Sequence, residues 1–191
     1  DTLNAYVQGS AVNGYFTISQ KNNGDGTYTV SVKIDEETPG GTYTLFVHEL
    51  GNTSVQASAT ITVIGLPDAA EVNGKQYKSL PRALDAAQDG DTVKLLADHT
   101  TNWSDVEAGE YATLAVVRKT LTLDLNLCTV DYLVVGEVVP DEEGGILEST
   151  DGNLTIVNNI QDGSHGKIKD LQFVNGSLAI QSGQIGDSDE G

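Results

Sequence analysis

The amino-acid sequence predicts an all-β protein, in which a small antiparallel sandwich precedes a solenoid of β-coils with a capping α-helix at its start. Three observations lead to this prediction. Apolar and polar residues alternate with a period of two over the first third of the chain. Short strand-like segments of similar shape recur in the second half. One segment near residues 79–88 instead has the apolar spacing of an α-helix. We therefore expect two domains, 1–68 and 69–191.

The first domain is expected to consist of paired antiparallel strands. Phe16 and Ile18 alternate with polar residues, and the same alternation runs through 28–34. The Asn-Asn-Gly-Asp-Gly segment between these stretches predicts a turn, because its residues tolerate positive φ angles. A second pair of alternating stretches covers 41–50 and 55–65, on either side of a Gly-Asn turn. Several short alternating strands at this spacing are typical of a sandwich.

A short segment rich in Gly, Pro and Asn, residues 65–75, separates the two halves. After it, an apolar stripe at helical spacing is formed by Leu80, Ala83, Leu84 and Ala87. The serine before this stripe suits an N-cap, a proline is tolerated in the first turn, and the glycine after the stripe ends the helix. We expect the helix to cover the open first coil of the solenoid with this stripe.

Strand-like segments of similar shape recur beyond the helix, each with a Leu-x-hydrophobic centre and with Asn or Gly at its end. The equivalent positions are Leu95, Leu123, Ile156 and Ile180. The intervals between them are 28, 33 and 24 residues, which is typical of stacked β-coils joined by variable loops. The last segment lies close to Gly191 without a cap. We therefore expect that the solenoid continues or that another molecule covers this end.

Three segments of the first domain, DGTYTVSVKID, GTYTLFVHEL and ATITV, share the pattern Gly-Thr-Tyr-Thr-hydrophobic or close on Thr-Ile-Thr-Val. They resemble the later strands of bacterial immunoglobulin-like modules of surface proteins, over about the first third of the chain. The resemblance implies an immunoglobulin-like β-sandwich without a catalytic residue. The intersheet disulfide and core tryptophan of antibody domains have no counterpart in this domain, because Cys128 and Trp103 lie in the second half.

The second domain contains the motifs SLPRALDAAQDGDTVKLL and LTLDLN, followed by NLTIV and SLAIQSGQI. Together they resemble the beginning of a right-handed parallel β-helix of the pectate-lyase-like superfamily, as found in large surface proteins of gut bacteria. The resemblance covers 71–191. The family pattern ends its LTLDLN strand in Asn-Gly, whereas this chain has Asn126 and Leu127. The resemblance implies the fold more than an activity, because such helices serve in lyases, hydrolases and non-catalytic adhesins alike.

The charge balance excludes two classes of partner. The formal net charge is -18 and the isoelectric point is near 4.2, so the field of the protein repels phosphate backbones and anionic lipid headgroups. We therefore expect no nucleic-acid partner. The chain also has no apolar run of about 18 residues, so we expect no membrane insertion. The single cysteine allows no intrachain disulfide. Thr-, Gly- and Asn-rich β composition favours an extracellular place, at the bacterial cell surface or secreted.

A basic and acidic patch around the LTLDLN strand is the first candidate site. Arg118 and Lys119 precede the strand, and Asp124 alternates with its inward leucines, so all three are expected on a coil surface. A polysaccharide lyase needs a basic residue near carboxylate-held calcium. A glycosidase needs two carboxylates roughly 5 to 10 Å apart, but the acidic clusters of this chain lie in Gly-containing turns. We therefore interpret the three residues as candidates for binding, on a solvated face.

Aromatic residues form the second candidate site. Trp103 and Tyr111 lie in a long excursion between strand segments, where an exposed ring would stack on a sugar or anchor a protein. The alternative is that Trp103 covers the edge of the solenoid. We expect no cofactor. Calcium is the one metal that the Asp-x-Asp spacings would suit, although the twelve-residue calcium loop with its terminal Glu is lacking.

The sequence thus predicts a non-catalytic adhesion or ligand-binding segment of a bacterial surface protein, with a host or extracellular glycan or protein as its partner. One alternative is a polysaccharide lyase or hydrolase, or an accessory carbohydrate-binding part of one. The other is a module that binds a host protein such as an immunoglobulin. A groove that holds Arg118 or Lys119 beside carboxylates would favour the enzyme. Loss of binding after changes at Trp103 would favour protein capture.

Overall fold

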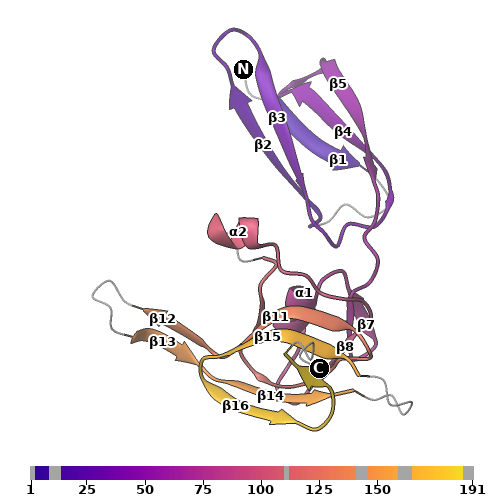
Figure 1. Cartoon of the computed structure of the whole chain (residues 1–191). Helices are drawn as coiled ribbons and strands as arrows, with labels where there is room; N and C mark the ends of the chain where they lie inside the picture. The colour runs from indigo at the N-terminus through magenta and orange to yellow at the C-terminus, as the bar shows by residue number, and fades with distance from the viewer. Residues whose placement is uncertain (1–2, 9–13, 110–111, 141–145, 159–164, 187–191) are drawn as a thin grey trace. The chain divides into compact units, whose positions relative to one another are not determined.

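The chain is mostly β-structure and divides into two compact units (Figure 1). The computed structural model describes residues 3–8, 14–109, 112–140, 146–158 and 165–186. Of these residues, 57% lie in strands and 7% in helices, which confirms the all-β class. Neither helix in these ranges is long and apolar enough to cross a membrane. The first unit spans Asp1–Pro67 and the second spans Asp68–Gly191.

The first unit consists of two antiparallel sheets. Its strands in the described ranges are β1 (Leu3–Gln8), β2 (Phe16–Asn22), β3 (Tyr28–Ile34), β4 (Gly41–Glu49) and β5 (Asn52–Val63). One sheet has the order β1-β4-β5, and the other is the β2-β3 hairpin. The turn of this hairpin contains Gly24 and Gly26, whose φ angles of +82° and +85° are accessible to glycine without strain. This is the turn that the Asn-Asn-Gly-Asp-Gly segment predicts.

An aromatic contact joins the two sheets of the first unit. Phe16 of β2 and Tyr43 of β4 meet edge to face, with 4.8 Å between the ring centroids. The Tyr43 side chain is 1% exposed, and its hydroxyl donates a hydrogen bond to the carbonyl of Pro39 at 2.9 Å. Among the described residues of this unit, Tyr43 is the only hydrophobic side chain that is fully buried. The unit therefore has a thin core.

The second unit contains two sheets with parallel pairing and a separate hairpin. The strands are β6 (Ala70–Val72), β7 (Lys75–Tyr77), β8 (Thr92–Leu95), β9 (Ala115–Val117), β10 (Thr120–Asp124), β11 (Thr129–Val135), β12 (Glu137–Pro140), β13 (Ile146–Thr150), β14 (Gly152–Val157), β15 (Lys167–Phe173), β16 (Gly176–Ile180) and β17 (Gln184–Ile185). One sheet has the order β16-β14-β10-β8-β6-β7 and the other β17-β15-β11-β9. The first sheet is parallel from β8 to β16, and the second is parallel throughout. The β12-β13 hairpin extends away from both sheets (Figure 1).

The parallel register aligns apolar side chains in rows across the strands. Leu123 of β10 pairs with Val93 on one side and with Ile156 on the other, and Ile156 pairs with Ile180. The first three are completely buried, whereas Ile180 is 52% exposed because β16 is the outermost strand. The row begins at Val93 and not at the predicted Leu95. Val93 and Leu95 both point inward, so a shift of the pairing register by two residues leaves the alternation unchanged. Alternation in the sequence therefore does not distinguish the two registers.

Helix α1 (Leu80–Ala86) covers part of this core. The side chain of Ser79 accepts a hydrogen bond from the amide of Arg82 and so caps the first turn, as predicted. The predicted apolar stripe faces the core and is at most 3% exposed at Leu80, Ala83, Leu84 and Ala87. The helix has seven residues, which is too short to be stable by helix propensity alone. Packing of the apolar stripe on the core therefore stabilises it.

The corner between β10 and β11 is built from Asn126 and Leu127, which both have left-handed backbone conformations with φ angles of 47° and 67°. The side-chain amide of Asn126 donates a hydrogen bond to the carbonyl of Leu95 at 2.8 Å, which links two successive passes of the chain. A leucine in the left-handed region costs about 1 to 2 kcal/mol, which a glycine at this position would avoid.

Candidate functional site

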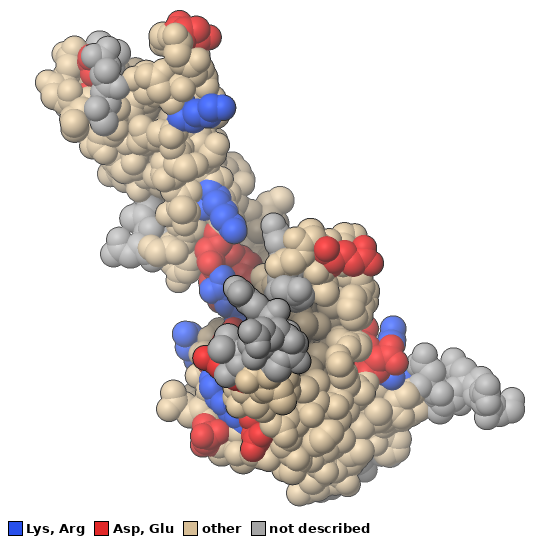
Figure 2. Space-filling view, turned by 90° about the vertical axis from the view of Figure 1, so that its left-hand side faces the viewer, with Lys and Arg blue, Asp and Glu red and all other residues tan. Residues whose placement is uncertain are grey.

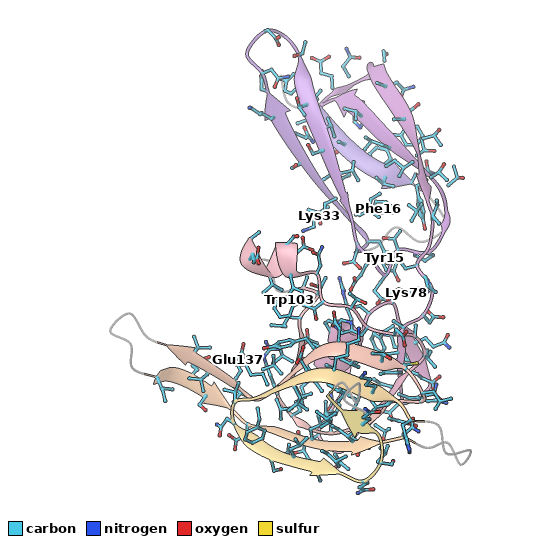
Figure 3. All side chains as sticks on the ribbon, in the orientation of Figure 1. Tyr15, Phe16, Lys33, Lys78, Trp103 and Glu137 are labelled. Atoms are coloured by element: carbon cyan, nitrogen blue, oxygen red, sulfur yellow. The ribbon has the colours of Figure 1, made fainter. Side chains whose placement is uncertain are left out.

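The excursion between β8 and β9 contains helix α2 (Trp103–Glu107), and Trp103 is its first residue. The side-chain oxygen of Asn102 caps the helix by accepting from the amide of Ser104 at 3.2 Å. The amide of Asn102 donates to the hydroxyl of Thr113 at 3.1 Å, which ties the two ends of the excursion together. The side chain of Trp103 is 47% exposed. Figure 3 shows it between α2 and the sheet that contains β11.

Trp103 packs against an aromatic side chain of the sheet. Its ring meets the ring of Tyr132 on β11 at 4.9 Å between centroids and an interplanar angle of 69°, an edge-to-face arrangement. The Tyr132 hydroxyl donates to the side-chain oxygen of Gln172 on β15 at 2.5 Å. The hydrogen bond fixes the Tyr132 ring, which in turn restricts the Trp103 ring. The result is a positioned, half-exposed aromatic pair.

Asp131 of β11 fixes the backbone that leads to this pair. Both of its carboxylate oxygens accept from the amide of Thr101 at 2.9 Å. The amide of Asp131 donates to the carbonyl of His99 at 3.1 Å, and the amide of His99 donates to the carbonyl of Thr129 at 2.8 Å. The chain from His99 to Thr101 is therefore held against a strand. Trp103 is positioned by the sheet and not by a free loop.

Two buried polar atoms lie in this segment, the Nε2 atom of His99 and the hydroxyl oxygen of Thr101. His99 is 9% exposed and Thr101 is 3% exposed, and neither atom has a hydrogen-bond partner in the described part of the chain. Burial lowers the pKa of His99 below 6.5, although the charge of Asp131 and a hydrogen bond with the backbone of Thr113 oppose this. The imidazole is therefore neutral at pH 7.

We expect the stability of the second unit to decrease when the pH falls from about 7.5 to about 5.5. The unfolded chain protonates His99 near pH 6.5, whereas the pKa in the folded chain is lower. The unfolded state therefore binds more protons in this interval, and the free energy of unfolding decreases as the pH falls. A His99→Gln variant should lose this part of the pH dependence.

Urea titrations of both proteins at the two pH values check this expectation. Trp103 is the only tryptophan of the chain, so its fluorescence reports on the second unit alone. The difference between wild type and variant in the free energy of unfolding should change with pH. A difference that stays constant with pH would contradict the assignment to His99.

Arg118, a predicted binding residue, is held in an ion pair. Its Nε and Nη2 atoms donate to the two carboxylate oxygens of Glu137 at 2.5 and 3.0 Å, and its Nη1 atom lies 3.6 Å from a carboxylate oxygen of Asp85. The hydrogen bonds to Glu137 raise the pKa of Arg118 above its usual value, and the same bonds lower the pKa of Glu137. The guanidinium thus stays charged and does not act as a base.

Lys119, the next predicted binding residue, caps the C-terminus of α1. Its Nζ atom donates to the carbonyls of Asp85 and Ala87, both at 2.6 Å. These carbonyls belong to the last turn, where intrahelical partners are lacking and a positive charge also favours the helix dipole. The structure therefore gives Lys119 a contact within the fold.

The other two predicted residues do not add to the exposed aromatic pair. Asp124 at the end of β10 is 5% exposed, so the prediction that it lies on a coil surface is wrong. Its carboxylate accepts from the amide of Asn126 at 3.1 Å, which supports the corner next to β10. Tyr111 lies outside the described residues. The structure thus brings Trp103 together with Tyr132. The contacts described for Arg118, Lys119 and Asp124 are instead made with other parts of the fold.

The Asp-x-Asp segment of the first turn after α1 binds backbone amides. Asp89 accepts from the amide of Thr120 at 2.7 Å, and Asp91 accepts from the amide of Gln88 at 2.8 Å. A hydrogen bond from the side chain of Asn73 is the main cause that lowers the pKa of Asp91. Within the described ranges, no three His, Cys, Asp or Glu side chains are arranged to hold a metal ion.

The residues that complete the aromatic pair and the ion pair were missed in the sequence. Tyr132 and Gln172 stabilise the Trp103 ring, and Glu137 binds Arg118. One signal for Tyr132 exists in the sequence of β11. In the sequence, two residues separate the apolar Val130 and Leu133, so the apolar-polar alternation breaks at this point. In the structure both side chains are completely buried. A break of this kind redirects a side chain to the surface.

Comparisons with protein-family models, with curated proteins and with solved structures find no match to this chain. A proposal for its function therefore depends on the geometry of its own side chains.

Proposed function

We propose that this chain is a non-catalytic ligand-binding segment of a bacterial cell-surface or secreted protein and acts in adhesion. The observation that carries the proposal is the aromatic pair, in which the half-exposed Trp103 packs on Tyr132 and Tyr132 is fixed by Gln172. A ring that is already positioned provides contact area at a low cost in conformational entropy. Tryptophan and tyrosine are also the residues that most often dominate the free energy of binding at protein interfaces. The partner is an extracellular glycan or protein.

The proposed architecture is an immunoglobulin-like sandwich followed by the first coils of a right-handed parallel β-helix. The two antiparallel sheets of the first unit and their shared contact between Phe16 and Tyr43 support the sandwich. The two parallel ladders of the second unit support the β-helix, because each successive pass of the chain adds one strand to both sheets. Helix α1 is then the cap of the first coil. Both parts resemble modules of bacterial surface proteins, so the location we propose is extracellular.

Arg118 does lie beside the carboxylates of Glu137 and Asp85, but as a charged ion-pair partner and not as a free base, which supports binding over catalysis. A uronic-acid lyase needs an unprotonated base beside the sugar, whereas Arg118 is locked in a two-point ion pair with Glu137. The Lys119 amine is occupied by carbonyls of α1. A glycosidase needs two carboxylates with the sugar between them, whereas the Arg118 guanidinium contacts both Glu137 and Asp85.

The surface charge supports a partner that is neither nucleic acid nor an anionic membrane. On the face drawn in Figure 2, most of the visible Lys and Arg side chains lie near Asp or Glu side chains, and uncharged residues separate these groups. The described residues of that face form no extended basic field. Together with the net charge of -18, this arrangement opposes phosphate-rich partners.

The proposal is tested by measuring the binding of the immobilised chain to a panel of purified host extracellular proteins and soluble glycans. We expect at least one partner, and we expect Trp103→Ala to weaken its binding by a factor of about 30, equivalent to about 2 kcal/mol. The matched control is Phe173→Ala, which removes another exposed aromatic side chain of the same unit, 49% exposed on β15. Its binding should equal that of the wild type.

Two results would contradict the proposal. One is turnover of a polysaccharide by the purified chain, which would favour an enzyme. The other is a partner that binds Trp103→Ala and wild type equally, since the aromatic pair would then not be the binding site. Circular dichroism of each variant verifies that the fold is retained.

A further inference from the structure

The sheet β1-β4-β5 of the first unit has one face that points away from Tyr43. Successive side chains of a strand alternate between the two faces of a sheet. Tyr43 is on the buried face, so the even-numbered residues of β4 lie on the opposite face, which we call the outer face. The pairing register adds the residues across from them on β1 and β5. The centre of the outer face consists of Asn4, Tyr6, Phe46, His48, Gln56 and Ser58.

Aromatic rings occupy the middle of the outer face. Tyr6 of β1 stacks on Phe46 of β4, with 5.5 Å between centroids and 24° between the ring planes. The ring of His48 stands edge-on to Tyr6 at 6.2 Å. The side-chain nitrogen of Asn4 lies 3.1 Å from Nε2 of His48, which fixes the imidazole. Tyr6 remains 44% exposed, so it presents a positioned ring with one face against Phe46 and the rest to solvent.

A hollow of about 170 Å³ lies next to these rings, lined by Phe46, Gln56, Ala57 and Ser58. It is smaller than the roughly 300 to 1,000 Å³ of pockets that enclose a small molecule. It therefore suits one unit of a longer ligand that lies across the sheet. Gln56 and Ser58 are exposed and supply an amide and a hydroxyl, groups that both donate and accept hydrogen bonds.

The outer face carries no Lys, Arg, Asp or Glu at any of its described positions on β1, β4 and β5. Charged residues make up 20% of the chain, so a surface of this size would on average carry about two of them. Sugar hydroxyls both donate and accept, as amides and hydroxyls of the protein do, and the apolar C–H face of a sugar ring packs on an aromatic ring. An anionic polysaccharide would find no lysine or arginine at these positions.

We infer that the outer face of the first unit binds a neutral saccharide chain, with Tyr6 as the stacking platform and with Gln56 and Ser58 as hydrogen-bonding groups beside it. This site lies in a different unit from Trp103. It goes beyond the proposed function, because it assigns a second binding site and specifies the uncharged class of its ligand.

The test is affinity electrophoresis of the full chain in gels that contain galactomannan, xyloglucan or a β-1,3-glucan, with polygalacturonate as the anionic counterpart. We expect retardation by at least one neutral polysaccharide and none by polygalacturonate. Calorimetry with that polysaccharide should give an association constant at least about tenfold lower for Tyr6→Ala. Tyr6→Phe keeps the ring and should stay within about twofold of the wild type.

Three further variants complete the test. Ser58→Glu places a charge on an exposed position of the hollow without removing a buried group, and it should abolish binding while circular dichroism stays unchanged. Ser31→Ala, on an exposed position of β3, should bind as the wild type does. Trp103→Ala should also retain neutral saccharide binding, which separates this site from the proposed one. Failure of all neutral polysaccharides to retard the chain, or unchanged binding by Tyr6→Ala and Ser58→Glu, would overturn the inference.

Discussion

Replacing Gly152 with alanine is expected to unfold the second unit, at a cost of about 4 kcal/mol or more in the free energy of unfolding. A β-carbon at this position would lie closer than 3.0 Å to the carbonyl oxygen of Val117 and to the amide nitrogen of Gly136. Both are backbone atoms, which do not move aside as a flexible side chain would. The φ angle of Gly152 is not in the left-handed region, so the expected loss is purely steric.

Gly152 is so restricted because three passes of the chain meet at this corner. The amide of Gly136 donates to the carbonyl of Val117 at 2.8 Å, and the amide of Gly152 donates to the carbonyl of Asn175 at 3.1 Å. Gly152 also pairs directly with Gly176 in the ladder of β14 and β16. Any side chain at this position would push apart strands that belong to the two parallel sheets. A single added methyl group is therefore expected to disturb the packing of the whole second unit.

Guanidinium titrations followed by the fluorescence of Trp103 measure the effect, with Gly90→Ala as the control. Gly90 has a φ angle of +89°, and a β-carbon added to it would meet no atom within 4 Å. Its substitution should cost only the backbone strain of about 1 to 2 kcal/mol. If Gly152→Ala costs no more than Gly90→Ala, the backbone of the neighbouring passes does not restrict this corner.

The sequence predicts strands and the helix better than their register. The stripe of α1 and the strands β2 to β5, β8, β10, β14 and β16 follow from periods of 3.6 and 2, which depend only on neighbouring residues. The sequence does not predict β1, the β12-β13 hairpin, or the strands β9 and β15 of the second parallel sheet. The pairing of Leu123 with Val93 instead depends on contacts between segments 30 positions apart. Alternation leaves Val93 and Leu95 equivalent, since both point inward. The requirement for glycine at Gly152 is likewise set by backbone from other passes of the chain.

The candidate sites also depend on contacts between segments that are distant in the sequence. The place of Trp103 in a polar excursion leaves open an exposed ring and a ring that covers the edge of the solenoid. Its half exposure and its fixation by Tyr132 and Gln172 depend on two strands distant in the sequence. Arg118 and Lys119 look like a binding pair when only their sequence position is considered. Their roles in the fold depend on Glu137 and on the end of α1, neither of which is adjacent in the chain. Arg118 and Lys119 are partly buried and Asp124 is buried, so charge next to a predicted strand predicts neither full exposure nor a ligand.

Replacing Leu84 with aspartate is the second change for which we expect a large effect, namely unfolding and aggregation of the second unit. Leu84 lies on the buried stripe of α1 and is 3% exposed. Loss of its burial costs about 1.5 to 3 kcal/mol, and an unpaired buried carboxylate adds several more. The sum is comparable with the whole stability of a small domain, about 5 to 15 kcal/mol.

Ala86→Asp is the matched control, because it adds the same charge to an exposed position of the same helix. A negative charge in the last turn costs at most about 1 kcal/mol through the helix dipole, so this variant should remain folded. Light scattering measures aggregation, and Trp103 fluorescence measures unfolding of the second unit. Unchanged solubility and melting of Leu84→Asp would refute the role of α1 as a cover of the core.

The part of the chain that unfolds in Leu84→Asp tests the division into two units. The continuous core beneath α1 contains only residues of the second unit among the described residues, from Ala70 to Ile168. The first unit has its own sheets and its own contact between Phe16 and Tyr43. We therefore expect the variant to lose the native Trp103 signal but to keep part of its β-sheet circular dichroism. Complete loss of both signals together would mean that the first unit depends on the core that α1 covers.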